Sequence, residues 1–244
     1  HPNVRMVSYI SEKNQMEYYS MVLSELTIQA LKNMASINQN IVIREGNVLE
    51  SIAEARNIYV QCDIEEEFAS EFGVYDLNEF LNVLGLVDKP HLKFANESVT
   101  VSDSTGRSKV KYFFTDVENL TFPTKKPKMP SEDIRFTLDN DTLNRIKRAA
   151  SALGHNEVVV TGSKDSITLT VRNTANPTSN TFAIDVEGSS NVDKYSFIFN
   201  IPNLKILAGD YEVIISSKLI SQFNHKDKPV KYWIALEKTS TYGE

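Results

Sequence analysis

The segment VYDLNEFLNVLGL, residues 74–86, leads from a strand end through a helix cap into a short helix. Asp76 is a favoured N-cap residue, and Glu79 follows at the capping-box spacing, with Asp in place of Ser or Thr. The apolar residues of the following turns share one helical face: Leu77, Phe80, Leu81 and Leu84. Taken alone, the segment predicts a capped helix that packs against the core of an α+β domain.

The same arrangement recurs later in the chain. The residues IFNI, 198–201, match VYDL, 74–77, as strand end, aromatic residue, cap and helix start. The helical segment IKRAASA, 146–152, matches LKNMASI, 31–37, at a similar displacement. These matches indicate two tandem domains, with chance agreement between short segments as the alternative.

Helices and strands follow the same order in both halves. An amphipathic helix capped by Ser24 is predicted at residues 24–38, and another, ended by Gly154, is predicted at 139–153. A second short helix, capped by Asn200, is predicted at 200–209. Runs of strands around two helices favour an antiparallel sheet with the helices gathered on one face. The predicted fold class is therefore α+β, with two tandem domains that each contain an antiparallel sheet and two helices on one face.

A proline-rich segment separates the two halves. FPTKKPKMP, residues 122–130, contains three prolines, which exclude a helix or a central strand. The start of the chain has no apolar signal core and little regular pattern, so it is predicted to be a loosely held extension. The predicted boundaries are an extension at 1–20, a first domain at 21–122, a connector at 123–130 and a second domain at 131–244.

Composition excludes several classes of protein. The chain has 244 residues, 41% of them hydrophobic, which suffices for the cores of one or two globular domains. The net charge of -6 argues against a uniformly basic nucleic-acid binder but permits a basic surface on an acidic body. Cys62 is the single cysteine, so neither an intrachain disulfide nor a cysteine-based metal cluster is expected. No apolar run approaches the roughly 20 residues that span a bilayer.

No pattern in the sequence predicts an enzyme. The four histidines are scattered, and Asp139 and Asp141 stand at a predicted helix start, where capping explains them better than metal binding. The acidic run at residues 65–67 is interpreted as a solvated loop. No catalytic residue, metal ligand or cofactor is therefore assigned.

Basic side chains lie on the predicted outer faces of the helices, including the short helix at 200–209. On a chain with net charge -6, a basic helical layer indicates contact with a phosphate backbone without reading of bases. A solvated helix surface is the alternative, because Lys and Arg are common there. The candidates for DNA contact are Lys32, Arg145, Lys147, Arg148 and Lys205.

Four segments resemble a known family. They are LKNMASIN (31–38), VYDLNEFLNVLGLV (74–87), GDYEV (209–213) and YWIALE (232–237), and they are similar to the DNA polymerase sliding clamp of T-even-type bacteriophages, a processivity factor. The resemblance runs from Met21 to the C-terminus. It implies a homotrimeric ring of two-domain subunits, with helices lining a hole through which duplex DNA passes without sequence specificity.

The resemblance also implies partners. A clamp loader driven by ATP opens and closes such a ring, the C-terminal peptide of the replicative DNA polymerase binds to it, and phage late-transcription factors use it. These events belong to the cytoplasm of the infected bacterial host, and the clamp has no active site, cofactor or membrane association. The alternatives from other classes are a monomeric processivity factor without a ring and a β-rich virion or adhesion module.

In this family, partner peptides insert apolar and aromatic side chains into a pocket beside the connector. Tyr59 matches an aromatic residue of that pocket. Trp233 and Ile234 on the last long strand are further candidates, with core packing as the alternative for Trp233. The connector residues that match the family are Pro127, Met129 and Pro130.

Overall fold

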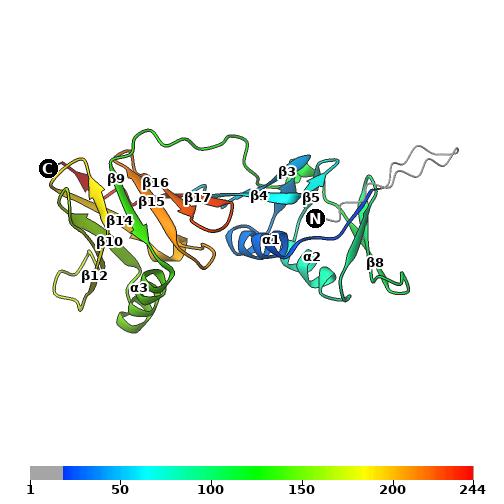
Figure 1. Cartoon of the computed structure of the whole chain (residues 1–244), viewed down its shortest axis with the longest axis horizontal. Helices are drawn as coiled ribbons and strands as arrows, with labels where there is room; N and C mark the ends of the chain where they lie inside the picture. Colours follow the sequence, from blue (N-terminus) through cyan, green and yellow to red (C-terminus); the bar gives the residue numbers. More distant parts are fainter. Residues whose placement is uncertain (1–18, 244) are drawn as a thin grey trace. The chain divides into compact units, whose positions relative to one another are not determined.

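The structure, a computed structural model, describes residues 19–243 of the chain. The chain forms two compact units, each drawn in Figure 1. The N-terminal unit holds the described residues up to Glu54 together with Gln61–Thr124, and the C-terminal unit holds Ala55–Val60 together with residues 125–243. Most of the predicted extension lies outside the described residues. None of the described helices is long and apolar enough to cross a membrane.

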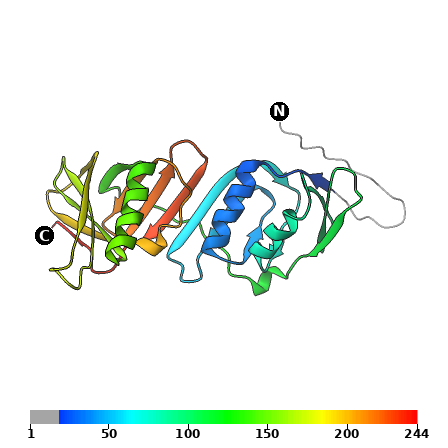
Figure 2. The same ribbon diagram turned by 90° about the horizontal axis from the view of Figure 1, so that it is seen from below.

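The N-terminal unit packs two α-helices on antiparallel strands. Its helices are α1 (Glu25–Ile37) and α2 (Leu77–Leu84), followed later by a 3₁₀ turn, η1 (Val117–Asn119). Its strands are β1 (Tyr19–Met21), β2 (Ile41–Ile43), β3 (Gly46–Ile52), β4 (Ile58–Phe68), β5 (Phe72–Val74), β6 (His91–Phe94), β7 (Ser98–Ser102) and β8 (Lys109–Phe113). One sheet has the order β1-β6-β7-β8, while β2 pairs with β5 and β3 with β4. In Figure 2, α1 and α2 lie on the same side of these strands.

Both helices of this unit begin at the predicted caps. The Ser24 side chain accepts a hydrogen bond from the Thr27 backbone N–H, and the Asp76 side chain accepts one from the Glu79 backbone N–H. Each cap satisfies a donor that the helix itself cannot pair. The predicted apolar face of α2 is buried through Leu77, Phe80 and Leu84, so the segment that indicates the fold is a core-facing helix.

The acidic run at residues 65–67 is not the predicted solvated loop. It lies in β4, where exposed and buried residues alternate, and Glu66 is only 2% exposed. Its carboxylate accepts hydrogen bonds from the Ser24 backbone N–H and the Thr27 hydroxyl. A carboxylate at this position also faces the partial positive charge of the start of α1. Glu66 therefore ties β4 to that helix.

The C-terminal unit contains two antiparallel sheets and one α-helix, α3 (Asn140–Leu153). Its strands are β9 (Ile134–Leu138), β10 (Glu157–Gly162), β11 (Ile167–Arg172), β12 (Phe182–Val186), β13 (Gly188–Ser190), β14 (Tyr195–Asn200), β15 (Tyr211–Ser216), β16 (Ile220–His225), β17 (Val230–Ala235) and β18 (Thr241–Tyr242). The first sheet has the order β12-β11-β10-β14-β18, and the second runs β13-β9-β15-β16-β17 and continues onto β4. Within this unit, the second sheet reaches the beginning of β4, because the Ala235 backbone N–H donates to the Asn57 carbonyl.

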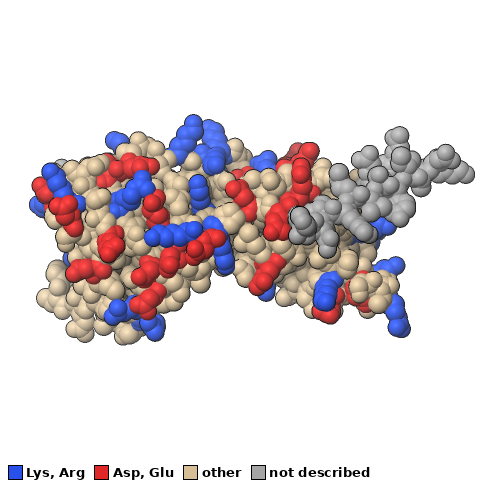
Figure 3. Space-filling model, viewed as in Figure 1, with Lys and Arg blue, Asp and Glu red and all other residues tan. Residues whose placement is uncertain are grey.

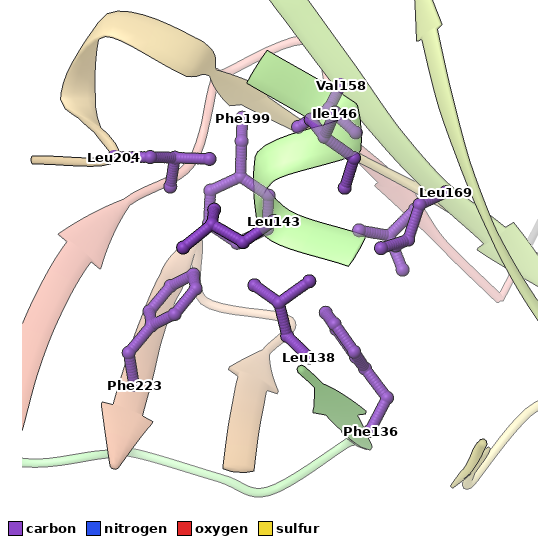
Figure 4. Close-up of a pocket in the computed structure, with 10 residues that line it drawn as sticks. Phe136, Leu138, Leu143, Ile146, Val158, Leu169, Phe199, Leu204 and Phe223 are labelled. Carbon is purple, nitrogen blue, oxygen red and sulfur yellow. The ribbon is translucent and has the colours of Figure 1, made fainter. Parts of the chain in front are cut away.

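Helix α3 starts and ends as the sequence predicts. Asp139 caps it by accepting a hydrogen bond of 2.7 Å from the Thr142 backbone N–H, and Gly154 ends it in the left-handed conformation at φ 69°. Leu143 and Ile146 point into an apolar core between the two sheets, shown in Figure 4. A void of about 20 Å³ remains there among aliphatic and phenyl groups. This space belongs to the core and offers no polar group to orient a ligand.

The second short helix, predicted at 200–209, is absent. The chain makes only a 3₁₀ turn, η2 (Ile201–Asn203), and the Asn200 side chain forms no capping hydrogen bond. Leu204 and Ile206 are both buried although they are only two residues apart. Residues on one face of a helix are three or four apart, so this burial pattern does not fit a helix. The predicted arrangement of two tandem α+β units is confirmed, but the C-terminal unit has one α-helix instead of two.

Candidate nucleic-acid interface and partner site

The outer face of α3 gathers three of the five predicted DNA-contacting residues. The helix contains three basic residues and one acidic residue, while its apolar residues face the core. The side chains that border a shallow, open depression on this face are Asp141, Asn144, Lys147, Arg148 and Ser151. Arg148 and Asn144 are exposed there, so flexible polar and cationic groups meet solvent along the helix.

Arg145 occupies a different part of the same helix. It pairs with Asp141 one turn earlier at 4.0 Å, which is a weak exposed contact. Its guanidinium also lies 5.9 Å from the ring centre of Phe182 on β12. Arg145 is therefore directed toward the β12 edge of the unit, whereas Arg148 borders the depression.

Lys147 is half-buried. Burial lowers the pKa of its ammonium below the usual value, because a charge partly removed from water is disfavoured. The side chain still borders the depression on α3. An anion placed there would favour the charged form and compensate for the lost hydration.

The other two predicted cations lie elsewhere. Lys32 is exposed on α1 of the N-terminal unit, a helix whose first turn also carries Glu25. Lys205 is exposed but stands in the irregular segment after η2, not on a helix as predicted. Arg145, Lys147 and Arg148 thus share helix α3, whereas Lys205 lies outside any helix and Lys32 belongs to the N-terminal unit.

The predicted partner-peptide residues Tyr59 and Trp233 meet within the C-terminal unit. Their ring centroids are 5.3 Å apart and the rings are inclined at 65°, an edge-to-face contact. Both are nearly buried, at 4% and 6% exposed. The Trp233 Nε1 atom is buried and has no hydrogen-bond partner among residues 19–243. Buried donors of this kind are rare in native proteins and call for a partner.

Ile234 faces the other way. Successive residues of a strand point to opposite faces of the sheet, so Ile234 and Trp233 cannot serve the same surface. Ile234 is fully buried, and its carbonyl accepts a hydrogen bond of 2.7 Å from the Ser221 hydroxyl. We therefore interpret Ile234 as a core residue.

The connector carries both apolar and basic side chains. Pro127 and Met129 are half-buried, and Pro130 is exposed. The basic residues of the connector, which are not among the predicted site residues, are all exposed: Lys125, Lys126 and Lys128. Basic side chains gather at the top of Figure 3, where Figure 1 draws the connector, while acidic and basic groups are mixed over the rest of that face.

Comparisons with known proteins agree with this architecture. Residues 24–118 match the family model described as DNA polymerase processivity factor, and residues 135–238 match that of the gp45 sliding clamp, C terminal. The chain is 34% identical over 223 residues to the sliding clamp of Vibrio phage KVP40, covering 89% of this chain and 99% of that protein. It is 28% identical over 233 residues to the sliding clamp of Escherichia phage RB69, covering 91% and 99%.

Solved structures share the fold at much lower sequence identity. A chain in the structure of the C-terminal region of FEN-1 bound to A. fulgidus PCNA aligns with a TM-score of 0.67 at 13% identity, covering 92% of this chain and 99% of that chain. The Proliferating Cellular Nuclear Antigen of Entamoeba histolytica aligns with a TM-score of 0.65 at 14% identity, covering 90% and 98%. Family models across both units and phage relatives along nearly the whole chain show that it belongs to the phage sliding clamps, the non-enzymatic processivity factors of DNA polymerase.

Proposed function

We propose that this clamp encircles duplex DNA as a homotrimeric ring and tethers the replicative DNA polymerase to its template. The observation that carries the proposal is the basic outer face of α3 on an acidic clamp-family chain. A ring whose helices face the DNA would direct this face toward the phosphates. The proposal includes opening and closing by an ATP-driven loader in the cytoplasm of the infected bacterium.

The charge pattern suits sliding better than tight binding. Arg148 and Lys147 extend from a helix surface on flexible side chains. They can therefore contact phosphates at any base sequence. Such contacts are screened and exchange readily at physiological salt. The net charge of -6 opposes strong attachment of the whole protein to DNA. Processivity would therefore come from topology, with the cations centring the duplex.

The aromatic pair Tyr59 and Trp233 supports a partner site on the C-terminal unit. We propose that the C-terminal peptide of the polymerase binds beside these rings and the connector residues Pro127, Met129 and Pro130, and that late-transcription factors use the same site. The unpaired Trp233 Nε1 would donate a hydrogen bond to the incoming peptide backbone. Apolar anchors with a few polar groups are typical of such sites.

The function is tested by primer extension on a primed circular template with a T-even-type polymerase, its clamp loader and ATP. Adding this chain should lengthen the products of single binding events, and omitting the loader should abolish the gain. The free protein should have a mass of about three 27.6 kDa chains. A monomer that stimulates synthesis on linear templates without a loader would instead support the monomeric processivity factor.

The partner site is tested with a labelled polymerase tail peptide. Tyr59→Ala removes one ring of the aromatic pair, and we expect the peptide affinity to fall about tenfold, as for an aromatic anchor in an interface. Tyr75→Ala is the matched control, because Tyr75 is 56% exposed and lies in the N-terminal unit. Full affinity in the Tyr59 variant would remove this residue from the site.

A further inference from the structure

The end of the connector is held by a group of hydrogen bonds that neither the basic face of α3 nor the aromatic pair uses. Asp133, one residue before β9, lies at the centre of this group. Its carboxylate accepts hydrogen bonds from the Ser131 hydroxyl, from the Ser217 backbone N–H at 2.7 Å and from the Tyr242 hydroxyl at 3.3 Å. Three segments that are distant in the sequence therefore meet at one side chain: the end of the connector, the turn after β15 and strand β18.

Ser131 and Ser216 extend this group onto the second sheet. Their hydroxyl oxygens are 2.7 Å apart, and Ser216 is fully buried. Because Ser131 gives its single hydrogen to Asp133, Ser216 must donate to Ser131, and the Ser216 oxygen accepts from the Lys218 backbone N–H at 3.1 Å. Each hydroxyl is thus paired, which defines one arrangement of the connector end. We call these four side chains the Asp133 latch: Ser131, Asp133, Ser216 and Tyr242.

The backbone at the latch is paired as well, in contrast to the connector before it. The Asp133 N–H donates to the Ile215 carbonyl at 2.9 Å, and the Asp133 carbonyl accepts from the Asn191 backbone N–H at 2.9 Å. Residues 125–130 lie in no helix or strand and form no backbone–backbone hydrogen bond within residues 19–243. A segment without such bonds has low local stability, so its path depends on where its end is held.

The latch carries a negative charge at neutral pH. Burial raises the pKa of the Asp133 carboxyl, but the hydrogen bonds from Ser131, Ser217 and Tyr242 outweigh this effect and hold the pKa below its usual value. Burial and the nearby carboxylate together raise the pKa of Tyr242, so its hydroxyl remains a protonated donor. The ionised carboxylate strengthens each of these hydrogen bonds.

The latch and Trp233 lie on the same face of the second sheet. Phe223 and its β15 pair Val213 face the core under α3, so Ile214 and Ser216 on β15 face the other way. Ile214 and Trp233 lie in one row across the sheet, joined through β16, and they are only 4% and 6% exposed. Figure 1 draws the connector on the side of this unit that lies away from α3.

We propose that Asp133 is a positioning residue of the partner site, which holds the connector at a defined place over the row of Ile214 and Trp233 and couples it to strand β18. The half-buried Pro127 and Met129 belong to the segment that the latch holds. A connector that is already in place loses less conformational entropy when a peptide binds beside it. This inference rests on the proposed partner site, and it adds the residue that positions that site and a role for the last strand of the chain.

The first measurement is limited cleavage of the full-length chain by trypsin. Lys128 is exposed and is followed by Met129, so the connector contains a cleavable bond. Asp133→Ala removes the acceptor of all three hydrogen bonds of the latch. We expect the initial rate of cleavage after Lys128 to rise about fivefold or more, because mobile exposed backbone is cut preferentially. Cleavage at sites outside the connector should not change.

The second measurement is the affinity for the labelled polymerase tail peptide, taken at a temperature where the variant is fully folded. Asp133→Ala should lower this affinity about threefold to tenfold, because the loosened connector must be ordered on binding. A role in stability alone would shift the unfolding transition and leave the affinity at this temperature unchanged.

Two further variants separate hydrogen bonding from charge. In Asp133→Asn, the amide oxygen can accept from Ser131 and Ser217 while the NH₂ group donates to the Tyr242 hydroxyl, so the affinity should stay within about twofold of the original. Tyr242→Phe should weaken binding about twofold to fivefold in the original chain and add nothing in the Asp133→Ala chain. It removes only one hydroxyl from a half-buried side chain, so it decides the matter if Asp133→Ala does not fold.

Asp103→Ala is the matched control. The Asp103 carboxylate also accepts hydrogen bonds, from the Thr105 N–H and hydroxyl and from the Arg107 N–H, but it lies in the N-terminal unit. This variant should bind the peptide and be cleaved in the connector like the original chain. An equal loss of affinity in the Asp103 and Asp133 variants would contradict a role specific to the latch.

The outcomes distinguish this inference from the proposed function. Full peptide affinity in Asp133→Ala, or in Tyr242→Phe where the former does not fold, overturns the positioning role and leaves the partner site intact. Unchanged cleavage after Lys128 in a folded Asp133→Ala chain overturns it as well. An original chain that does not bind the tail peptide contradicts the proposed partner site together with this inference.

Discussion

Helices α1 and α3 occupy matching places in the two units but differ in their starts and in their outer surfaces. The start of α1 is held by its cap Ser24 and by the buried Glu66 of β4, whereas α3 is capped by its own Asp139. The outer face of α1 carries one basic residue, and that of α3 carries three. The buried residues of the two helices are similar because they determine the packing of each unit. The exposed residues are not constrained by packing, so their charge can differ between the two units.

This difference makes the proposed DNA surface uneven. Helix α2 contains one acidic residue and no basic one, and its exposed side chains include the neutral amides of Asn78 and Asn82. The helices of the N-terminal unit would therefore present mostly neutral polar groups to DNA. The C-terminal unit would supply most of the positive field.

The largest effect is expected from removing the carboxylate that holds α1. Glu66→Ala leaves the Ser24 backbone N–H and the Thr27 hydroxyl without their acceptor, and a buried unpaired donor costs about 1–3 kcal/mol. Urea unfolding followed by circular dichroism should show a loss of that size. Glu65→Ala, at the exposed neighbouring position, should change the free energy of unfolding by less than about 0.5 kcal/mol. Equal losses in both variants would contradict the role of Glu66.

The second effect concerns the charge of α3. Lys147→Glu with Arg148→Glu should raise the clamp concentration for half-maximal polymerase stimulation about tenfold or more, because each lost phosphate contact costs about fivefold near 0.15 M salt. Lys32→Glu on α1 should change that concentration only about two- to fivefold. A larger effect from Lys32 than from the α3 pair would reverse the assignment of the two helices. Unchanged unfolding curves would show that neither variant acts through stability.

The third and smallest effect concerns the start of α3. Asp139→Ala removes the cap and should cost about 1 kcal/mol of unfolding free energy near neutral pH. The hydrogen bonds from Thr142 hold the pKa of Asp139 below its usual value. Its contribution is therefore present above about pH 4 and is lost as the pH falls through the lowered pKa. The difference in stability between the original chain and the variant should shrink as the pH falls through the lowered pKa of Asp139, and a difference that does not change with pH would contradict this cause.

The sequence predicts the parts of the fold that depend on neighbouring residues. The caps Ser24, Asp76 and Asp139 and the terminating Gly154 all act as predicted, because helix starts and ends depend on local hydrogen bonds. The internal matches between the two halves predicted two tandem domains, and the resemblance to sliding clamps implies the same division. Local patterns therefore suffice for α1, α2 and α3.

Local patterns fail where distant segments decide the outcome. Nothing around Glu66 distinguishes it from its exposed neighbours, since its partners lie about 40 residues earlier in the chain. The segment after Asn200 has an apolar content typical of a short helix, yet the Tyr232 hydroxyl accepts a hydrogen bond from the Leu207 backbone N–H and holds an irregular path. The contact between Tyr59 and Trp233 likewise depends on the pairing of β4 with β17.

A clamp that stays on DNA by encircling it should be released when the DNA circle is cut. The labelled clamp is loaded onto nicked circular DNA with the loader and ATP, the loader is removed, and the retained fraction is followed at constant salt before and after a single restriction cut away from the nick. Encirclement predicts long retention on the circle and loss within the time needed to slide off the new ends. Equal retention before and after the cut would contradict it.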